Sequence, residues 1–156
     1  MRIATWNVNS LKARQEAVEL WLAKAQPDVL LIQETKLSDN DAPVMPMRML
    51  GYEMAHHGEG RWNGVAILSR VGIEEIVSNF GDGPVRDSGP GGTGGANASE
   101  DDFDPFDEAR MIAATVDGLR VASIYAPNGR VVDSPFYLGK LAWFDRLARW
   151  IRESDT

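Results

Sequence analysis

The chain of 156 residues contains 44% hydrophobic and 25% charged residues, the composition of one soluble globular domain. It has no apolar run of the roughly 18–20 residues that a membrane-spanning helix needs, and it begins without a signal-peptide pattern, so we expect neither membrane insertion nor secretion. It also lacks cysteine. This excludes a disulfide scaffold, a cysteine nucleophile and a thiolate metal site, and it suits a reducing cytoplasm.

The net charge of −7 is concentrated in one segment. Between Gly81 and Glu108 the chain carries eight acidic residues and one basic residue, so the remainder is neutral. Overall charge therefore neither supports nor excludes nucleic-acid binding. Residues 81–107 also hold 7 of the 15 glycines and almost no aliphatic residues, too few to offset the entropy of ordering. We expect a flexible acidic insertion there, with an autoinhibitory or partner-binding segment as the alternative.

The first part of the chain predicts a β-α-β unit. Residues 2–8 are rich in strand formers, and Ser10 is a suitable N-cap for a helix from Leu11 to about Gln26. The continuous apolar run 29–32 is typical of a strand buried on both faces, as in a parallel or mixed sheet covered by helices.

The middle of the chain predicts mainly short strands. After a helical turn or two at 44–50, strands are expected at 52–57, 65–69, 73–77, 110–116 and 119–126. A turn at 70–72 would join the second and third of these strands. Asp117-Gly118 is a strong two-residue hairpin signal between the last two.

A final helix is expected from Ser134-Pro135 to about Glu153, because an N-cap followed by proline favours a helix start. Its apolar face would comprise Leu138, Leu141, Phe144, Leu147, Ala148 and Ile151.

Three polar side chains stand at the ends of predicted strands: Asn7, Glu34 and Tyr125. Ligands of open α/β sheets gather beyond the carboxyl ends of strands, so Asn7 and Glu34 can face one site. A carboxylate with an amide is a hard-oxygen set that suits Mg²⁺. From spacing alone, however, the simpler interpretation is favoured, in which both residues cap loops or form local ion pairs.

Several motifs then occur in a fixed order along the chain: TWNVNSLKAR, PDVLLIQETK, GY…HH, WNGVAILSR, EARMI and IYAPNG. Together they closely resemble the exonuclease III branch of the endonuclease/exonuclease/phosphatase superfamily, over nearly the whole chain except the acidic insertion. The resemblance implies an α/β fold, a four-layered sandwich of two similar halves. This chain would be one half, a mixed β-sheet with flanking helices.

The same resemblance implies the roles of the strand-end residues. Glu34, in QETK, matches the family's magnesium-binding glutamate. Asn7, in WNVN, matches an active-site asparagine that supports the metal and either the catalytic aspartate or the attacking water. Tyr125, in IYAPNG, matches the catalytic tyrosine whose hydroxyl lies near the scissile phosphate. The implied cofactor is Mg²⁺, with Mn²⁺ as a substitute.

Three further residues are candidates for substrate binding. Asn128 belongs to the turn after Tyr125 and would lie near the phosphate. Arg110, in EARMI, would flank the site or form an ion pair with Glu108. Lys36 would contact DNA phosphate or be solvated.

Two other features have a structural interpretation. His56 and His57 look like a metal pair, but adjacent residues of a strand point to opposite faces, so we expect neither to bind metal. Asn63, at the entry of a strand, is expected to position its loop.

Two motifs of the resembled family are missing. Its Gly-Asp-x-Asn and Ser-Asp-His motifs, which supply the general-base aspartate and the histidine, do not occur in this sequence. We therefore expect residues 1–156 to be a truncated, N-terminal part of the domain with negligible activity alone. One face of its sheet would be exposed where the second half packs.

The implied function is that of a DNA-repair nuclease. It would hydrolyse phosphodiester bonds 5′ to abasic sites and trim duplex DNA from the 3′ end, so its partner would be double-stranded DNA with abasic sites or 3′ ends. The full-length protein would be a cytoplasmic monomer without membrane association. The alternatives are a sister phosphoesterase acting on inositol phosphates or sphingolipid head groups, and a non-catalytic fragment.

Overall fold

The computed structural model describes residues 1–81 and 104–154, so most of the insertion predicted at 81–107 lies outside the described residues. In chain order the elements are β1 (Ile3–Asn7), α1 (Leu11–Ala25), β2 (Val29–Gln33), the short 3₁₀ turn η1 (Asp39–Asp41), α2 (Val44–Met49), β3 (Glu53–His57), β4 (Val65–Ser69), β5 (Glu74–Ser78), β6 (Met111–Val116), β7 (Leu119–Ile124) and α3 (Pro135–Ser154). None of these helices has the length and apolarity needed to cross a membrane.

The strands form two sheets. The first has the order β1-β2-β4-β3, in which β1 and β2 are parallel and the other pairs antiparallel. The second is the antiparallel sheet β5-β6-β7. The predicted α/β class, a mixed sheet with helices, is confirmed. What the sequence did not reveal is that the turn after β4 leads the chain out of the first sheet and into the second.

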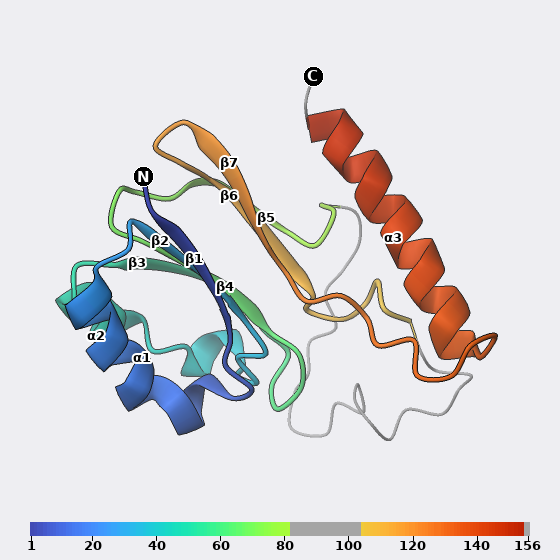
Figure 1. Cartoon of the computed structure of the whole chain (residues 1–156), viewed down its shortest axis with the longest axis horizontal. Helices are drawn as coiled ribbons and strands as arrows, with labels where there is room; N and C mark the ends of the chain where they lie inside the picture. Colours follow the sequence, from blue (N-terminus) through green and yellow to red (C-terminus); the bar gives the residue numbers. More distant parts are fainter. Residues whose placement is uncertain (82–103, 155–156) are drawn as a thin grey trace.

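The predicted β-α-β unit is confirmed almost to the residue. The Ser10 hydroxyl accepts a hydrogen bond from the Ala13 backbone nitrogen at 3.3 Å and so caps α1. Leu11, Val18 and Leu22 of α1, with Met47 of α2, pack against the first sheet. Both helices therefore cover one face of that sheet, and the β6–β7 hairpin lies on its other side (Figure 1).

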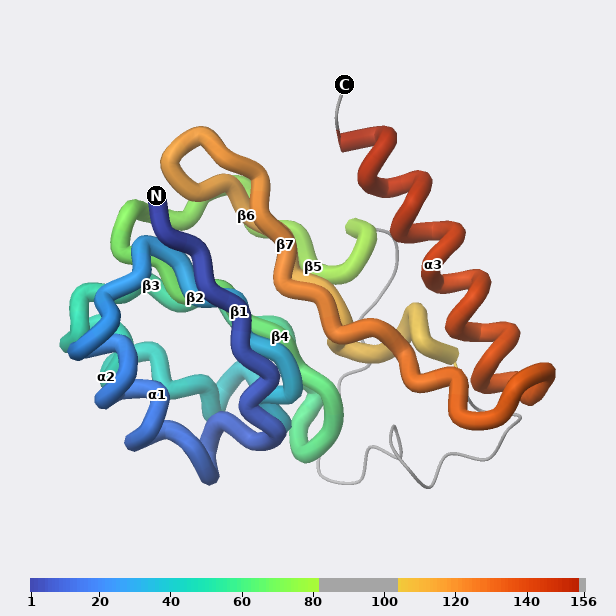
Figure 2. The backbone as a smooth tube through the Cα atoms, in the orientation of Figure 1, coloured from blue at the N-terminus to red at the C-terminus, as the bar shows by residue number. Residues whose placement is uncertain are grey.

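The second face of the first sheet is covered by the second sheet. Val29 and Leu31 of β2 point into a core that they share with Val65, Ile67, Ile112, Ala114 and Val116. The expectation of an exposed sheet face is therefore wrong for β2, whose Val29, Leu30 and Ile32 are fully buried. The physical reason is that the chain supplies its own second layer when β6 and β7 fold back over β2 and β4 (Figure 2).

α3 lies on the far side of the molecule from α1 and α2 (Figure 1). It packs through Trp143 and Leu147 against Phe80 and Met111 of the second sheet and its flank. The predicted apolar face is wrong at Leu138, Leu141, Phe144 and Ile151, which are exposed, whereas Leu147 is buried and Ala148 is partly buried. The helix has a second apolar stripe with the larger side chains Phe136 and Trp143, and that stripe is buried.

This arrangement predicts different costs for two identical changes in α3. Leu147→Ala should lower the free energy of unfolding by about 2 kcal/mol or more, because it removes buried methyl groups. Leu138→Ala, whose side chain is 57% exposed, should change it by less than about 0.5 kcal/mol. Urea denaturation measures both. Equal losses would show that α3 docks through the face that we describe as exposed.

Candidate active site

Asn7 and Glu34 meet at one edge of the first sheet. Because β1 and β2 are parallel with Asn7 opposite Gln33, the residue after Gln33 emerges beside Asn7. The Asn7 amide Nδ2 donates a hydrogen bond to Glu34 Oε1 at 2.8 Å. Its Oδ1 accepts one from the Asn9 backbone nitrogen at 3.1 Å. The predicted proximity is confirmed, and the amide holds the carboxylate in one orientation.

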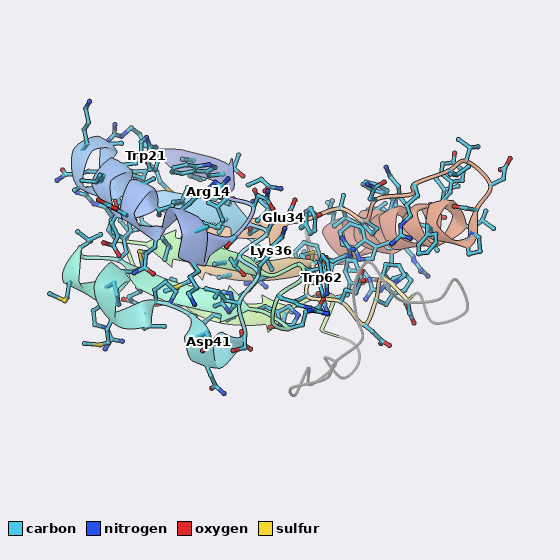
Figure 3. All side chains as sticks on the ribbon, turned by 90° about the horizontal axis from the view of Figure 1, so that it is seen from below. Arg14, Trp21, Glu34, Lys36, Asp41 and Trp62 are labelled. Atoms are coloured by element: carbon cyan, nitrogen blue, oxygen red, sulfur yellow. The ribbon has the colours of Figure 1, made fainter. Side chains whose placement is uncertain are left out.

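Lys36 is the third polar side chain at this edge. Its ammonium lies 3.5 Å from Glu34 Oε2 and donates a hydrogen bond to Asn9 Oδ1 at 2.5 Å. Figure 3 shows Glu34 and Lys36 next to each other, between Arg14 and Trp62 in that view. Both side chains are partly exposed, 19% for Glu34 and 27% for Lys36, so the pair is accessible to a ligand.

Tyr125 follows β7 in the second sheet and faces Glu34. Burial raises the pKa of the Tyr125 phenol, and the negative charge of Glu34 and a hydrogen bond to it raise the pKa further. A phenol is protonated at neutral pH already at its ordinary pKa of 10.0, so the hydroxyl can donate a hydrogen bond. All three predicted strand-end residues are thus brought together, from two different sheets.

A buried hydrogen bond sets the distance between those two sheets. Gln33 Nε2 donates to Ser123 Oγ at 3.0 Å, and Ser123 Oγ donates to the Ile32 carbonyl at 2.7 Å. Gln33 directly precedes Glu34, and Ser123 lies two residues before Tyr125. This contact therefore aligns the two functional residues. Sequence reasoning missed it, and its only signal was the glutamine of the QETK motif.

Arg110 lies behind Tyr125 and is buried. Its Nε donates to Glu108 Oε2 at 2.5 Å, and its guanidinium lies 5.1 Å from the centre of the Tyr125 ring. Of the two roles predicted for Arg110, the ion pair with Glu108 is therefore present. Its side chain is only 8% exposed, so its contacts are with the tyrosine rather than with solvent. Its role as a substrate-binding residue stays a prediction.

Asn128 is exposed in the loop after Tyr125. Its Oδ1 accepts a hydrogen bond from the Arg130 backbone nitrogen at 2.9 Å, which closes a local turn. The position is accessible to a substrate, and that role too stays a prediction.

The two histidines have separate environments, as their alternation along β3 predicts. His56 contacts Thr35 Oγ1 and Asp39 Oδ1 at 2.8 and 2.7 Å. His57 is buried, and its Nε2 has no hydrogen-bond partner among the described residues. Within residues 1–81 and 104–154, no three histidine, cysteine, aspartate or glutamate side chains are grouped to hold a metal.

The loop between β3 and β4 supports the residues next to Glu34. The buried Glu59 carboxylate accepts hydrogen bonds from Asn63 Nδ2 and from the Ala109 backbone nitrogen, the latter at 3.0 Å. The carbonyls of Asn63 and Gly64 accept from the backbone nitrogens of Lys36 and Thr35 at 2.9 and 3.1 Å. The expectation that Asn63 positions its loop agrees with these contacts.

The fold and this site place the chain in a known class. The model of the Endonuclease/Exonuclease/phosphatase family matches residues 4–155. The chain belongs to that family.

Three relatives define the likeness more closely. The chain is 39% identical over 80 residues to exodeoxyribonuclease III of Haemophilus influenzae, covering 51% of this chain and 30% of that protein. An AP endonuclease from Archaeoglobus fulgidus has a similar structure, with a TM-score of 0.80 and 32% identity over 98% of this chain and 51% of that one. The structure of a 3′ phosphatase from Neisseria, bound to a product DNA hairpin, is similar with a TM-score of 0.79 and 35% identity. The match covers 99% of this chain and 52% of that one. The chain thus spans about half the length of these two solved relatives.

Gly64 is predicted to be intolerant of any side chain. Its φ of +90° is strained for other residues, and an added Cβ would overlap Thr35 Oγ1. Gly64→Ala should therefore lower the free energy of unfolding by several kcal/mol, about 2 kcal/mol more than strain alone predicts. Gly72→Ala is the matched control, because φ is +93° there and nothing lies within 4 Å of an added Cβ. Equal effects in chemical denaturation would mean that the contact with Thr35 is unimportant.

Stability is predicted to fall in mildly acidic solution. Burial lowers the pKa of His57 below its ordinary value of 6.5, and burial lowers the pKa of His56 likewise. Below pH 6.5 the unfolded chain then binds more protons than the folded chain, so the free energy of unfolding decreases. As the pH falls from about 7.5 to 5.5, each histidine should lower the free energy of unfolding by at most about 1 kcal/mol per pH unit.

The variant His57→Gln measures how much His57 contributes to the pH dependence of the free energy of unfolding. The variant should show a flatter dependence of unfolding free energy on pH than the wild type, whatever its absolute stability. An unchanged slope would contradict the burial effect on His57.

Proposed function

We propose that this chain contributes the metal-binding glutamate, the supporting asparagine and the catalytic tyrosine of a DNA-repair nuclease of the exonuclease III type. The reaction is hydrolysis of phosphodiester bonds 5′ to abasic sites and trimming of duplex DNA from its 3′ end. The observation that carries the proposal is the convergence of Asn7, Glu34 and Tyr125 at one edge of the sandwich. The names of the relatives, one of them bound to a product DNA hairpin, support DNA as the substrate.

The Glu34 carboxylate fits a magnesium site. It is partly exposed, one oxygen is oriented by the Asn7 amide, and the other lies 3.5 Å from the Lys36 ammonium. Mg²⁺ usually keeps several waters and takes only one or two carboxylates from the protein, so a single glutamate suffices as its anchor. Mg²⁺, or Mn²⁺ in its place, would supply the positive charge that stabilises the negative charge developing on a scissile phosphate.

The chain's own side chains have distinct tasks in this proposal. Asn7 orients Glu34, and the protonated Tyr125 phenol donates its hydroxyl hydrogen to a phosphate oxygen. Arg110 packs on the tyrosine ring and limits its movement. Lys36 and Asn128, both accessible beside the site, contact the DNA phosphates.

Hydrolysis also requires groups that the 156 residues do not contain. The family resemblance implies a general-base aspartate and a histidine in motifs that this sequence lacks, and the solved relatives are about twice as long. Loss of members of a catalytic unit removes several orders of magnitude of rate. Residues 1–156 would therefore supply only part of the catalytic unit.

A graft tests this function. Residues 1–154 replacing the matching half of the Archaeoglobus fulgidus AP endonuclease should incise duplex DNA 5′ to an abasic site in the presence of Mg²⁺. Glu34→Ala in the graft should reduce the rate at least about 100-fold, because the metal loses its protein ligand. Glu16→Ala, on the exposed face of α1, is the control and should leave the rate unchanged.

Other outcomes separate the alternatives. A graft that hydrolyses inositol phosphates but not DNA would identify a sister phosphoesterase. Incision by the 156-residue chain alone, which we expect to be undetectable, would show that the required groups lie within it.

A further inference from the structure

Three side chains from separate elements form a hydrogen-bonded chain next to Glu34. Thr35 Oγ1 lies 2.8 Å from His56 Nε2, and His56 Nδ1 lies 2.7 Å from Asp39 Oδ1. Asp39 Oδ1 also accepts a hydrogen bond from the Gly58 backbone nitrogen at 2.9 Å. We call this set the Thr35–His56–Asp39 chain; it links η1 and β3 to the segment that follows β2.

The chemistry of the three groups sets the direction of the hydrogen bonds. An ionised carboxylate can only accept, so the hydrogen of the ring lies on His56 Nδ1 and points to Asp39. Burial lowers the pKa of His56, which keeps the ring neutral at neutral pH. Its Nε2 then has a free lone pair and accepts from the Thr35 hydroxyl. Each of the three groups is therefore satisfied in one arrangement only.

The order of these groups resembles that of a nucleophile, a base and an orienting acid, but Thr35 is fully buried. Its hydroxyl cannot reach a substrate. Any role of the Thr35–His56–Asp39 chain must therefore be indirect, through the backbone of Thr35.

That backbone lies between two residues in an unfavourable conformation. Glu34 has φ of +55° and Lys36 has φ of +53°, the left-handed region that residues other than glycine rarely adopt. Such conformations persist only where the surroundings enforce them. Thr35 is the point of enforcement: its nitrogen donates to the Gly64 carbonyl at 3.1 Å, and its carbonyl accepts from the Leu11 nitrogen at 2.9 Å. Its hydroxyl supplies the third attachment, to His56.

We propose that Thr35, His56 and Asp39 are positioning residues that hold the Glu34 carboxylate against Asn7. Without the hydroxyl contact, Thr35 can rotate and the left-handed residues on either side can relax. The Glu34 carboxylate then loses its fixed place at 2.8 Å from Asn7 Nδ2. The predicted effect on metal affinity rests on the proposed function of Glu34, whereas the effect on the Asn7 contact does not.

The test uses the 156-residue chain and the variant Thr35→Val, which removes the hydroxyl and keeps the branched shape. In the metal-free protein, NMR signals of the Asn7 side-chain amide should shift toward those of a free amide. The ¹⁵N signal of His56 Nε2 should also move, because it loses its donor. Titration with Mn²⁺ should show roughly tenfold weaker binding, as is usual when a residue supporting a metal ligand is lost.

Two variants control for a general loss of stability. Thr35→Ser restores the hydroxyl and should recover both the amide signals and the Mn²⁺ affinity. Thr115→Val removes a comparable hydrogen bond, to Glu75 Oε2 at 2.7 Å, on the second sheet and should change neither.

A further variant keeps the proposal testable if Thr35→Val does not fold. Asp39 is 59% exposed, so Asp39→Ala should fold, free the His56 ring and shift the Asn7 signals in the same direction. Unchanged Asn7 signals and Mn²⁺ affinity in a folded variant would overturn the proposal. Glu34→Gln separates the two hypotheses: if it binds Mn²⁺ as the wild type does, the metal site is wrong, while the Asn7 signals still decide on the positioning role.

Discussion

The hydrogen bond between Gln33 and Ser123 determines how the two sheets of this protein are aligned. Apolar contacts such as those of Val29 and Ile112 hold the sheets together but have no direction, so they would tolerate a sliding displacement. A hydrogen bond between a buried amide and a buried hydroxyl does not tolerate such a displacement, because each group would lose its partner. Ser123 also donates to the Ile32 carbonyl, which ties β7 to the end of β2. Since Glu34 and Tyr125 follow directly beyond these contacts, their meeting is a consequence of this alignment.

The candidate site has an accessible layer and a buried supporting layer. Glu34 and Lys36 are partly exposed, and ion pairs of that kind contribute only about 0–1 kcal/mol to stability, so their value lies in binding. The groups behind them satisfy one another. Glu108 with Arg110 and Glu59 with Asn63 are buried pairs, and the buried Thr35 is connected through His56 to the exposed Asp39. Removing one partner of such a buried pair leaves the other without compensation, which costs more than the pair contributes. The supporting layer can therefore hold a strained backbone at the site.

The described residues also form a core of their own, although the chain spans about half the length of its solved relatives. α1 and α2 cover one face of the first sheet and the second sheet covers the other. One uncovered apolar surface lies on α3, where Leu138, Leu141, Phe144 and Ile151 face outward. From the sequence we predicted that a face of β2 would be exposed, because the apolar pattern of a strand does not indicate which element will cover it.

Local patterns in the sequence determined the β-α-β unit, the Ser10 cap and the β6–β7 hairpin, and the parallel pairing of β1 with β2 in that unit brought Asn7 to Glu34. Each of these follows from neighbours within a few residues or from the parallel pairing of two strands joined by one helix. The tertiary structure alone decided the division into two sheets, the buried stripe of α3 and the place of Arg110 behind Tyr125. It also decided the bond between Gln33 and Ser123, which are 90 residues apart. No periodicity encodes contacts over such separations, because they depend on which surfaces are left to be buried once the local elements have formed.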